Sequence, residues 1–382
     1  MRNPQYSLKI RSQTGYGKEI YEFNSADGLE SKNTFRDEEL AIAEIVQPEE
    51  HDRVLVAESG YGFLGAVMGD MTPEAETVLG ETSDRAYQLS EQNMDLNDIQ
   101  KTECLKLGFY SELDQGFDKI VYAPKAYQPV DLVKHRIENL VTLLDGEGEL
   151  IISGKKKTGF KRYRKHLESF EGETEKLGQE ADVKVYRYTK EPGFAPEATD
   201  IEKKYSTKVQ DVRMEFRTCE GLFSPDSLDQ GTRILLENLE LTEKGKVLDL
   251  ATGYGTVTAF MNADNEELEY YLSDDNGMAV RYAEKNMKLN DVSDFYLKHS
   301  DCLDGFKNER FDLVVSNPPT HQGRMVTTEM FEESYQVLNK TGKLVIVYNG
   351  NMKFEDQLKD IFEKVEVTAE EDGFKVAEAV KK

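Results

Sequence analysis

A short stretch of the chain, Phe311–Gly323, joins an apolar run to residue types that can hold an amino group. The run Phe311–Val315 predicts a buried parallel strand. The strand must end before Pro318 and Pro319, because proline cannot donate a hydrogen bond to a sheet. Asn317 therefore follows the carboxyl end of the strand, which is where ligands bind in open α/β sheets.

This Asn-Pro-Pro sequence suits transfer chemistry on nitrogen. The side-chain oxygen of Asn317 and the carbonyl oxygen of Pro318 are acceptors that can bind both hydrogens of a planar amino group. The nitrogen can then direct its lone pair at an electrophile such as a sulfonium methyl group, whose leaving group is neutral. Such a reaction needs positioning more than acid–base catalysis. The alternative is a proline-terminated strand before an ordinary loop, so the rest of the chain must decide.

The chain contains two copies of one pattern. Val54–Gly62 resembles Val247–Gly255, which lies 193 positions later, and the same spacing relates Asn93–Asp98 to Asn286–Asp291. A spacing larger by one residue relates later parts of the two copies. The sequence therefore predicts a duplicated domain that accounts for nearly the whole chain.

The boundaries of the two domains follow from composition. We predict domains at residues 1–190 and 201–382, with a linker at 191–200, where Pro and Gly cluster. In each copy, strands such as Arg53–Ala57 and Phe117–Tyr122 alternate with helical patterns. This alternation predicts an α/β fold with a mostly parallel sheet in each domain.

In the second copy a glycine-containing turn follows the strand Val247–Leu250, close to Asp249. Gly253 and Gly255 permit close approach of a ligand to the backbone. The turn is not a full dinucleotide fingerprint, because Ala251 stands at the first glycine. Turns of this kind serve many nucleotide-like ligands.

Carboxylates follow the next two predicted strands. Asp274 comes after Tyr270–Ser273, where it can accept hydrogen bonds from ribose hydroxyls, and Asp275 is the alternative. Asp301 follows Phe295–Lys298 and can accept from an adenine amino group. A single acid of this kind is more often a solvated loop residue. Acids at three successive strand ends before Asn-Pro-Pro indicate a nucleoside site.

The first copy lacks these polar groups. Val56 stands at the position of Asp249, and Ala123 stands at the position of Asn317. An alanine cannot orient an amine. We therefore predict that the first copy is not catalytic.

The second copy resembles the class I S-adenosylmethionine methyltransferases, and within them the small-domain family of ribosomal RNA guanine-N2 methyltransferases. The resemblance rests on Phe223–Thr232, Val247–Gly255, Asn317–Gly323 and Val347–Asn351. The first copy is similar to the degenerate N-terminal half of bacterial members that modify the small subunit. The resemblance implies two tandem Rossmann-like domains, a seven-stranded, doubly wound sheet and a final antiparallel strand near Phe374–Val380. It also implies S-adenosyl-L-methionine as cofactor and methyl transfer to guanine N2 of 16S-type ribosomal RNA.

The resemblance also implies a role for each site residue. Asn317, Pro318 and Pro319 would be catalytic, with Asn317 orienting the target amine. Asp249, Gly253 and Gly255 would face the methionine moiety, Asp274 the ribose and Asp301 the adenine. The whole implied cofactor site comprises Gly231, Thr232, Asp249, Ala251, Gly253, Gly255, Asp274, Asp301 and Cys302, the last as a small buried residue rather than a nucleophile.

One position departs from the family. Its members usually carry an aromatic residue after the second proline, which can stack on the flipped base. Here Thr320 cannot stack, and His321 is the candidate replacement, although a capping or core role for His321 is an equal alternative. This departure bears on guanine recognition more than on methyl transfer.

RNA binding must be reconciled with a formal net charge of -25. The electrostatic field of this negative charge repels nucleic acid at low salt. A salt-rich, halophilic cytoplasm would screen that repulsion. The basic segment Lys155–His166 is the candidate RNA contact, through Lys155, Lys156, Lys157, Lys161 and Arg162. The alternative is a solvated helix face that pairs with Glu168, Glu171 and Glu173.

Composition excludes other classes of protein. No run of 18 apolar residues and no secretory leader occurs, and the three cysteines lack metal-ligand spacing. We expect a cytoplasmic monomer without a metal, acting on ribosomal RNA or the small ribosomal subunit. Two alternatives remain: a glutamine-amide methyltransferase of a release factor, and a non-catalytic scaffold that binds RNA or ribosomal protein.

Overall fold

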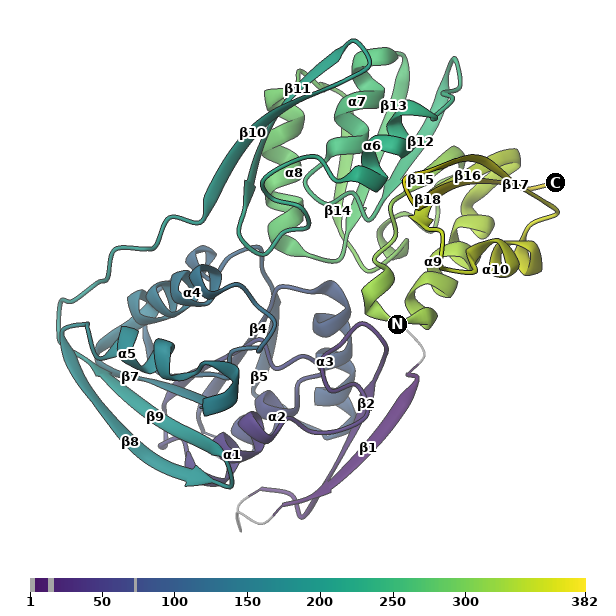
Figure 1. Cartoon of the computed structure of the whole chain (residues 1–382). Coiled ribbons are helices and arrows are strands. Elements are labelled where there is room, and N and C mark those ends of the chain that lie inside the picture. Colours follow the sequence, from purple (N-terminus) through teal and green to yellow (C-terminus); the bar gives the residue numbers. More distant parts are fainter. Residues whose placement is uncertain (1–3, 13–16, 72–73) are drawn as a thin grey trace. The chain divides into compact units, whose positions relative to one another are not determined.

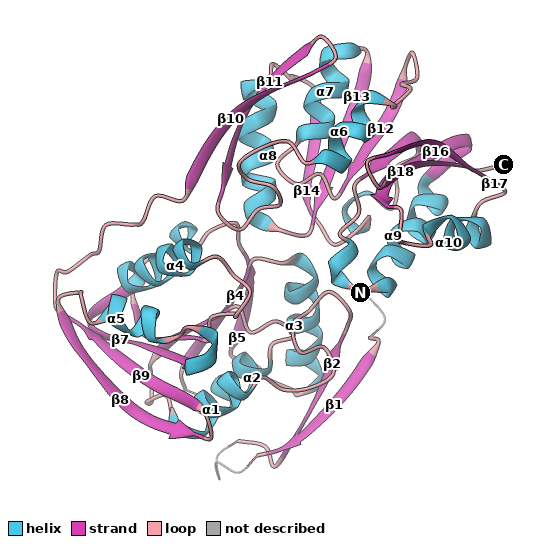
Figure 2. Ribbon diagram, viewed as in Figure 1, coloured by secondary structure: helices cyan, strands magenta, loops and turns pink. Residues whose placement is uncertain are grey.

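The computed structural model describes residues 4–12, 17–71 and 74–382, and the chain divides into two compact units, Met1–Ile201 and Glu202–Lys382 (Figure 1). Each unit combines a β hairpin with a seven-stranded sheet and flanking helices (Figure 2). The predicted linker, residues 191–200, contains neither helix nor strand. It is tied to the first unit, because the backbone nitrogen of Thr199 donates to Glu138 Oε2 at 2.5 Å.

The first unit has a mostly parallel sheet. Its strands are β1 (Tyr6–Arg11), β2 (Ile20–Ser25), β3 (Arg53–Ala57), β4 (Glu76–Glu81), β5 (Thr102–Lys106), β6 (Phe117–Tyr122), β7 (Leu144–Lys155), β8 (Gly172–Glu180) and β9 (Val183–Lys190). Its helices are α1 (Asp37–Ile45), α2 (Phe63–Met71), α3 (Asp84–Leu96), α4 (Val130–Leu143) and α5 (Lys161–Leu167). The hairpin pairs β1 with β2. The sheet has the order β5-β4-β3-β6-β7-β9-β8, and its pairings are parallel except those of β9.

The second unit repeats this plan. Its strands are β10 (Glu202–Val209), β11 (Val212–Cys219), β12 (Gly245–Leu250), β13 (Leu268–Asp274), β14 (Phe295–His299), β15 (Phe311–Ser316), β16 (Leu338–Asn349), β17 (Lys364–Glu371) and β18 (Phe374–Val380). Its helices are α6 (Gln230–Glu237), α7 (Thr256–Asp264), α8 (Gly277–Leu289), α9 (Arg324–Val337) and α10 (Phe354–Ile361). The sheet order is β14-β13-β12-β15-β16-β18-β17, with β18 antiparallel to both neighbours.

The strand orders of the two sheets are the same, position for position. The predicted fold class, two tandem Rossmann-like domains with doubly wound, mostly parallel sheets, is therefore confirmed. The expected final antiparallel strand is β18. It inserts between β16 and β17, so the last strand of the chain is not at the edge of its sheet.

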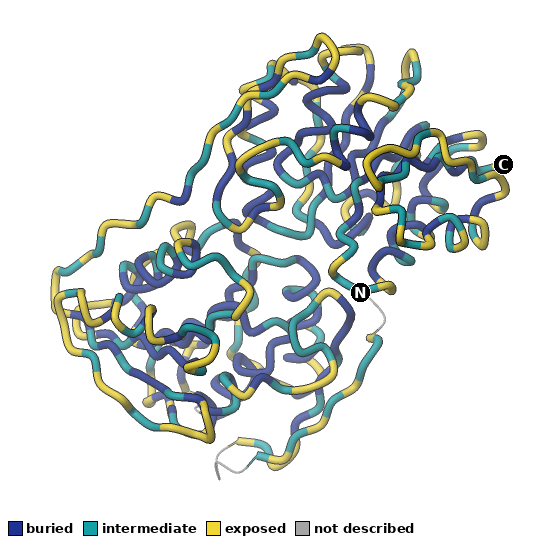
Figure 3. Tube along the Cα trace, in the orientation of Figure 1, coloured by how far each residue is buried: buried dark blue, intermediate teal, exposed yellow. Residues whose placement is uncertain are grey.

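The central strands carry continuous apolar runs because helices cover both faces of each sheet. Val54–Val56 in β3 and Leu313–Val315 in β15 are almost completely shielded from solvent. Figure 3 shows this buried interior in each unit. Strand β15 ends at Ser316, directly before Asn317 and the two prolines, as predicted.

The repeated asparagines attach the hairpin of each unit to its sheet domain. Asn286 on α8 accepts a bond from the backbone nitrogen of Arg217 at 2.8 Å and donates to the carbonyl oxygens of Arg217 and Tyr254, both at 2.8 Å. It thus pairs with β11 as a neighbouring strand would. The same three bonds join its counterparts in the first unit, Asn93, Asn24 and Tyr61.

Two elements extend beyond the apolar patterns that predict them. Helix α2 reaches Met71, which is itself buried although polar Asp70 interrupts the apolar pattern. Strand β7 begins at Leu144, before its apolar run, because a register shift in its pairing with β6 accommodates the polar residues 145–148.

Candidate active site

Asn317 lies at the carboxyl edge of the second sheet and contacts the start of helix α6. Its Nδ2 donates to Thr232 Oγ1 at 2.9 Å and to Asp229 Oδ2 at 3.2 Å. Asp229 caps α6, since the same Oδ2 accepts from the backbone nitrogen of Thr232 at 2.8 Å. A carboxylate can only accept hydrogen bonds, so the amide nitrogen faces Asp229 and the amide oxygen is directed elsewhere.

The residues after Asn317 form a tight, partly buried turn. Pro318 is buried, and the carbonyl oxygen of Pro319 accepts from the backbone nitrogen of Gln322 at 3.1 Å. Thr320 and His321 belong to the short 3-10 helix that this bond closes, and the His321 side chain is exposed. His321 is accessible to a ligand, while its assignment as a base-stacking residue stays a prediction.

Asp249 is buried near the end of β12 and bonds within its own turn. Its Oδ2 accepts from the hydroxyls of Thr252 at 2.7 Å and Thr258 at 2.8 Å, and from the backbone nitrogen of Thr258 at 3.1 Å. Burial raises the pKa of Asp249 to about 6, although these hydrogen bonds act in the opposite direction. One carboxylate oxygen therefore shapes the turn between β12 and α7.

The two glycines of this turn serve different purposes. Both have left-handed backbone angles, with φ of 58° at Gly253 and 90° at Gly255. A Cβ at Gly255 would lie 2.5 Å from Cε of Met287, so this glycine permits close packing of α7 on α8. A Cβ at Gly253 would meet no atom within 4 Å. Space for a ligand therefore exists at Gly253, while Gly255 packs closely on Met287 and is favoured by its left-handed φ. Ala251 also adopts a left-handed angle, with φ of 60°.

Asp274, at the end of β13, is held against the same turn. Its Oδ2 accepts from the backbone nitrogen of Gly253 at 2.8 Å, and its Oδ1 accepts from the backbone nitrogen of Asn276 at 2.8 Å. Burial raises its pKa to about 7. The backbone carbonyl of Asp275, the alternative carboxylate, lies 3.0 Å from His299 Nε2.

Asp301 and Cys302 follow β14 at the same edge and are both buried. Cys302 has a left-handed φ of 44°, and its carbonyl oxygen accepts from the hydroxyl of Ser273 at 2.8 Å. Its backbone thus ties the end of β14 to β13. The roles predicted for both residues in cofactor binding stay predictions.

Gly231 and Thr232 lie in the first turn of α6. A Cβ at Gly231 would lie 2.9 Å from the ring of Phe374, so glycine is required by packing against β18. Thr232, which was expected only in the cofactor site, contacts Asn317 directly. The sequence reasoning did not select Asp229. Its position before an apolar helix is a helix-capping signal, but that signal does not predict a contact with Asn317.

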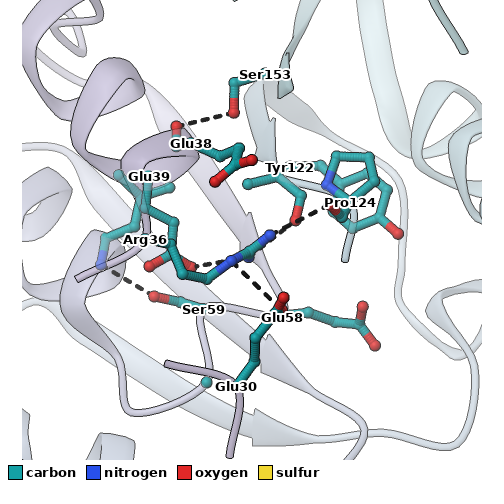
Figure 4. Close-up of polar contacts among 12 residues, drawn as sticks. Glu30, Arg36, Glu38, Glu39, Glu58, Ser59, Tyr122, Pro124 and Ser153 are labelled. Carbon is teal, nitrogen blue, oxygen red and sulfur yellow. Dashed lines mark hydrogen bonds and ion pairs between the residues drawn. The ribbon is translucent and has the colours of Figure 1, made fainter. Parts of the chain in front are cut away.

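In the first unit an arginine lies at the corresponding strand end. Arg36 Nη1 donates to the carbonyl oxygen of Ala123 at 3.0 Å, and Nη2 donates to that of Pro124 at 3.2 Å (Figure 4). The guanidinium is buried and is balanced by Glu30 and Glu39, each 3.4 Å away. The strand end that corresponds to Asn317 is therefore already bonded to a side chain of the first unit itself.

A second buried charge pair lies in the glycine turn of the first unit. Glu58 Oε2 is 2.7 Å from Nη1 of Arg136, and it also accepts from Gln128 at 3.0 Å. Burial by itself would raise the pKa of Glu58, but Arg136 and the neighbouring donors outweigh it and lower the pKa to about 2. The glycine turn of the first unit thus contains a buried carboxylate, which is paired with an arginine of the same unit.

The basic segment Lys155–His166 is only partly exposed. Lys155 pairs with Asp37 and also lies 3.9 Å from Asp182. Its side chain is only 13% exposed. Lys156, Lys157, Lys161 and Arg162 are exposed. The structure therefore presents four of the five predicted RNA contacts to solvent and engages Lys155 within the first unit.

Comparison with known proteins decides the family. The description "Methyltransferase small domain" fits this chain twice, at residues 21–187 and 213–378. The chain belongs to the methyltransferase small domain family. The family resemblance and the domain duplication inferred from the sequence are thereby confirmed.

Relatives within the family are similar along most of their length. "Ribosomal RNA small subunit methyltransferase C" of Shewanella amazonensis is 30% identical over 298 residues, which cover 74% of this chain and 85% of the relative. "Ribosomal RNA large subunit methyltransferase G" of Aliivibrio salmonicida is 27% identical over 299 residues, covering 75% and 77%. A T. thermophilus 16S rRNA N2 methyltransferase, solved with AdoMet and guanosine, matches the fold with a TM-score of 0.80 over 98% of both chains at 22% identity.

Two further features bear on function. Among the described residues no group of three or more His, Cys, Asp or Glu side chains is arranged to hold a metal ion. Across the same residues, no helix is long and apolar enough to cross a membrane.

Proposed function

We propose that the second unit of this family member transfers a methyl group from S-adenosyl-L-methionine to the exocyclic N2 of guanine in ribosomal RNA. The observation that carries the proposal is the orientation of Asn317. Its nitrogen is held by Asp229 and Thr232, so its oxygen is left to accept from a target amine. The relatives named above, which are ribosomal RNA methyltransferases, support the RNA substrate.

The residues of the second unit fit the cofactor. Gly253 offers open space at the turn, and the half-buried carboxylate of Asp274 lies beside it, where ribose hydroxyls could donate. We assign the cofactor to Gly253 and Asp274, together with Asp301 at the next strand end. When bound, S-adenosyl-L-methionine supplies an electrophilic methyl group on a sulfonium.

The side chains around Asn317 act by positioning. The Asn317 oxygen and the Pro318 carbonyl accept the two hydrogens of the target amino group and so direct its lone pair toward the methyl group. Neither acceptor is a strong base. The nitrogen therefore loses its proton to solvent after methyl transfer, and the rate depends on geometry more than on acid–base strength.

The first unit has a different role in this proposal. Ala123 offers no side chain to hold an amine, and Arg36 already bonds to the strand end. We assign to this unit the binding of ribosomal RNA or of the small ribosomal subunit, through Lys156, Lys157, Lys161 and Arg162, which are exposed.

The test is transfer of labelled methyl groups from S-adenosyl-L-methionine to total RNA, total protein and free nucleotides, at low and high KCl. The wild type should label RNA at guanine N2. The Asn317→Ala variant should lose about 2–4 kcal/mol of transition-state stabilisation, by analogy with oxyanion-hole donors. Its cofactor affinity by calorimetry should be unchanged. Label in protein but not in RNA would instead support the glutamine-amide alternative, and no label in any fraction would support a non-catalytic scaffold.

A further inference from the structure

Arg36 and Asp229 stand at equivalent positions of the duplicated chain, 193 residues apart. Arg36 immediately precedes α1, and Asp229 immediately precedes α6. Each contacts the residues that follow a central strand of its own unit. Arg36 donates to the carbonyl oxygens of Ala123 and Pro124, whereas Asp229 accepts from Asn317. Equivalent residues thus contact equivalent strand ends in the two units. Arg36 donates its hydrogen bonds, whereas Asp229 accepts one.

The reversal follows from what each strand end offers. Ala123 has no polar side chain, and Arg36 contacts the backbone carbonyls of Ala123 and Pro124. A guanidinium has only donors, so it suits these two acceptors. Asn317 has an NH2 group and an oxygen, and a carboxylate can bond only to the NH2 group. Rotation of the Asn317 amide by half a turn would place its oxygen against Asp229 Oδ2, where two acceptors repel. Asp229 therefore selects one of the two amide orientations.

Thr232 completes this selection. Its hydroxyl has a single hydrogen, which is directed to Asp229 Oδ2 at 3.2 Å. The lone pairs of Thr232 Oγ1 are thus left to accept from Asn317 Nδ2 at 2.9 Å. The hydroxyl is buried with its residue, which is 7% exposed, so water competes little for these bonds.

We propose that Asp229, acting with Thr232, is a positioning residue for methyl transfer, which holds the Asn317 amide with its oxygen toward the target amino group. An acceptor at this position cannot bond to the carbonyl of Pro318, so that carbonyl is left for the target as well. In the first unit the donor Arg36 bonds to the equivalent carbonyl of Pro124. This inference rests on the proposed function of Asn317.

The variants separate positioning from helix capping. Thr232→Val removes the hydroxyl at nearly constant volume, and Thr232→Ser restores it. Asp229→Ser keeps a good helix cap but shortens the side chain that reaches Asn317. The control Ser83→Ala removes a helix cap in the first unit, where Ser83 Oγ accepts from the backbone nitrogen of Ala86 at 3.2 Å.

The first measurement is the rate of single-turnover methylation of ribosomal RNA by the full chain at saturating S-adenosyl-L-methionine. Thr232→Val and Asp229→Ser should slow transfer by about 10- to 100-fold, because a small misplacement of a reacting group has effects of this size. Thr232→Ser should recover most of the rate, and Ser83→Ala should match the wild type. The affinity of Asp229→Ser for S-adenosyl-L-methionine should match that of the wild type, because Asp229 is not among the residues assigned to the cofactor. Wild-type rates in Thr232→Val and Asp229→Ser would overturn the inference.

A second measurement needs no substrate. In protein with isotope-labelled asparagine, the side-chain NH2 signals of Asn317 are identified by their loss in Asn317→Ala. In the wild type the hydrogens of this NH2 group should exchange slowly with solvent. In Asp229→Ser the signals should shift to the resonance positions typical of exposed asparagines. Unmoved signals in that variant would overturn the inference. If the wild type methylates nothing, the proposed function fails, but these signals still decide whether Asp229 holds the amide.

Discussion

Glu81 Oε1 accepts a hydrogen bond from the backbone nitrogen of Gly60 at 2.8 Å, and so repeats in the first unit the bond between Asp274 and Gly253. The first unit has kept the contact that shapes the glycine turn. It differs at the position of Ala251, where Glu58 has the same left-handed conformation but carries a buried charge. The shape of the turn is thus shared by both units, while its surroundings differ.

The chain should therefore bind one cofactor molecule, in the second unit. Asp274→Asn should weaken S-adenosyl-L-methionine binding by about 1.5–3 kcal/mol, the value of a charged hydrogen bond. The matched variant Glu81→Gln, at the equivalent position, should leave binding unchanged. Calorimetry measures both stoichiometry and affinity. Two sites per chain, or equal losses in the two variants, would contradict the assignment of the first unit as non-catalytic.

Cofactor affinity should rise with pH. Burial raises the pKa of Asp274 to about 7, so its carboxylate is largely protonated at pH 6 and ionised at pH 8. The ionised form is the better acceptor for ribose hydroxyls, so binding should tighten as pH rises through 7. Asp274→Asn should lose the part of this pH dependence that is centred near pH 7. A similar pH profile in both proteins would exclude Asp274 as the ribose acceptor.

The ion pair of Glu58 and Arg136 should matter for folding rather than catalysis. Both side chains are buried, so Arg136→Met leaves a buried carboxylate unpaired and should reduce the free energy of unfolding by about 3–5 kcal/mol. The control Glu76→Gln breaks an exposed contact with Arg53 and should cost about 0–1 kcal/mol. Urea denaturation followed by circular dichroism compares them. Equal denaturation midpoints for Arg136→Met and the wild type would show that the buried ion pair contributes nothing to stability.

The exposed basic residues should bind RNA phosphates without sequence preference. Neutralising Lys156, Lys157, Lys161 and Arg162 to Gln should weaken all RNAs alike and flatten the salt slope by about one unit per lost phosphate contact. Lys155→Gln alone should have a smaller effect, because Lys155 is paired with Asp37. Filter binding across a KCl series measures this. Superimposable curves for the fourfold variant and the wild type would remove the segment from RNA binding.

Much of this protein followed from local sequence. The strand before Asn317, the glycine turn after β12 and the acids at successive strand ends were all read from short patterns, because apolar periodicity and proline or glycine act over a few residues. The duplication was equally accessible, since it needs only the comparison of the chain with itself. Because the two units are copies of one domain, they have the same strand order.

Tertiary structure alone decided which side chains meet. Asp229 and Asn317 are separated by 88 residues, and Lys155 and Asp37 by 118. No local pattern encodes either contact. The first orients the amide of Asn317, and the second pairs Lys155 within the first unit rather than leaving it on the predicted RNA surface. Both contacts form because, in each unit, the start of the helix that precedes the sheet lies beside the ends of sheet strands. Hydrogen-bond polarity then determines which residue types are compatible at those strand ends.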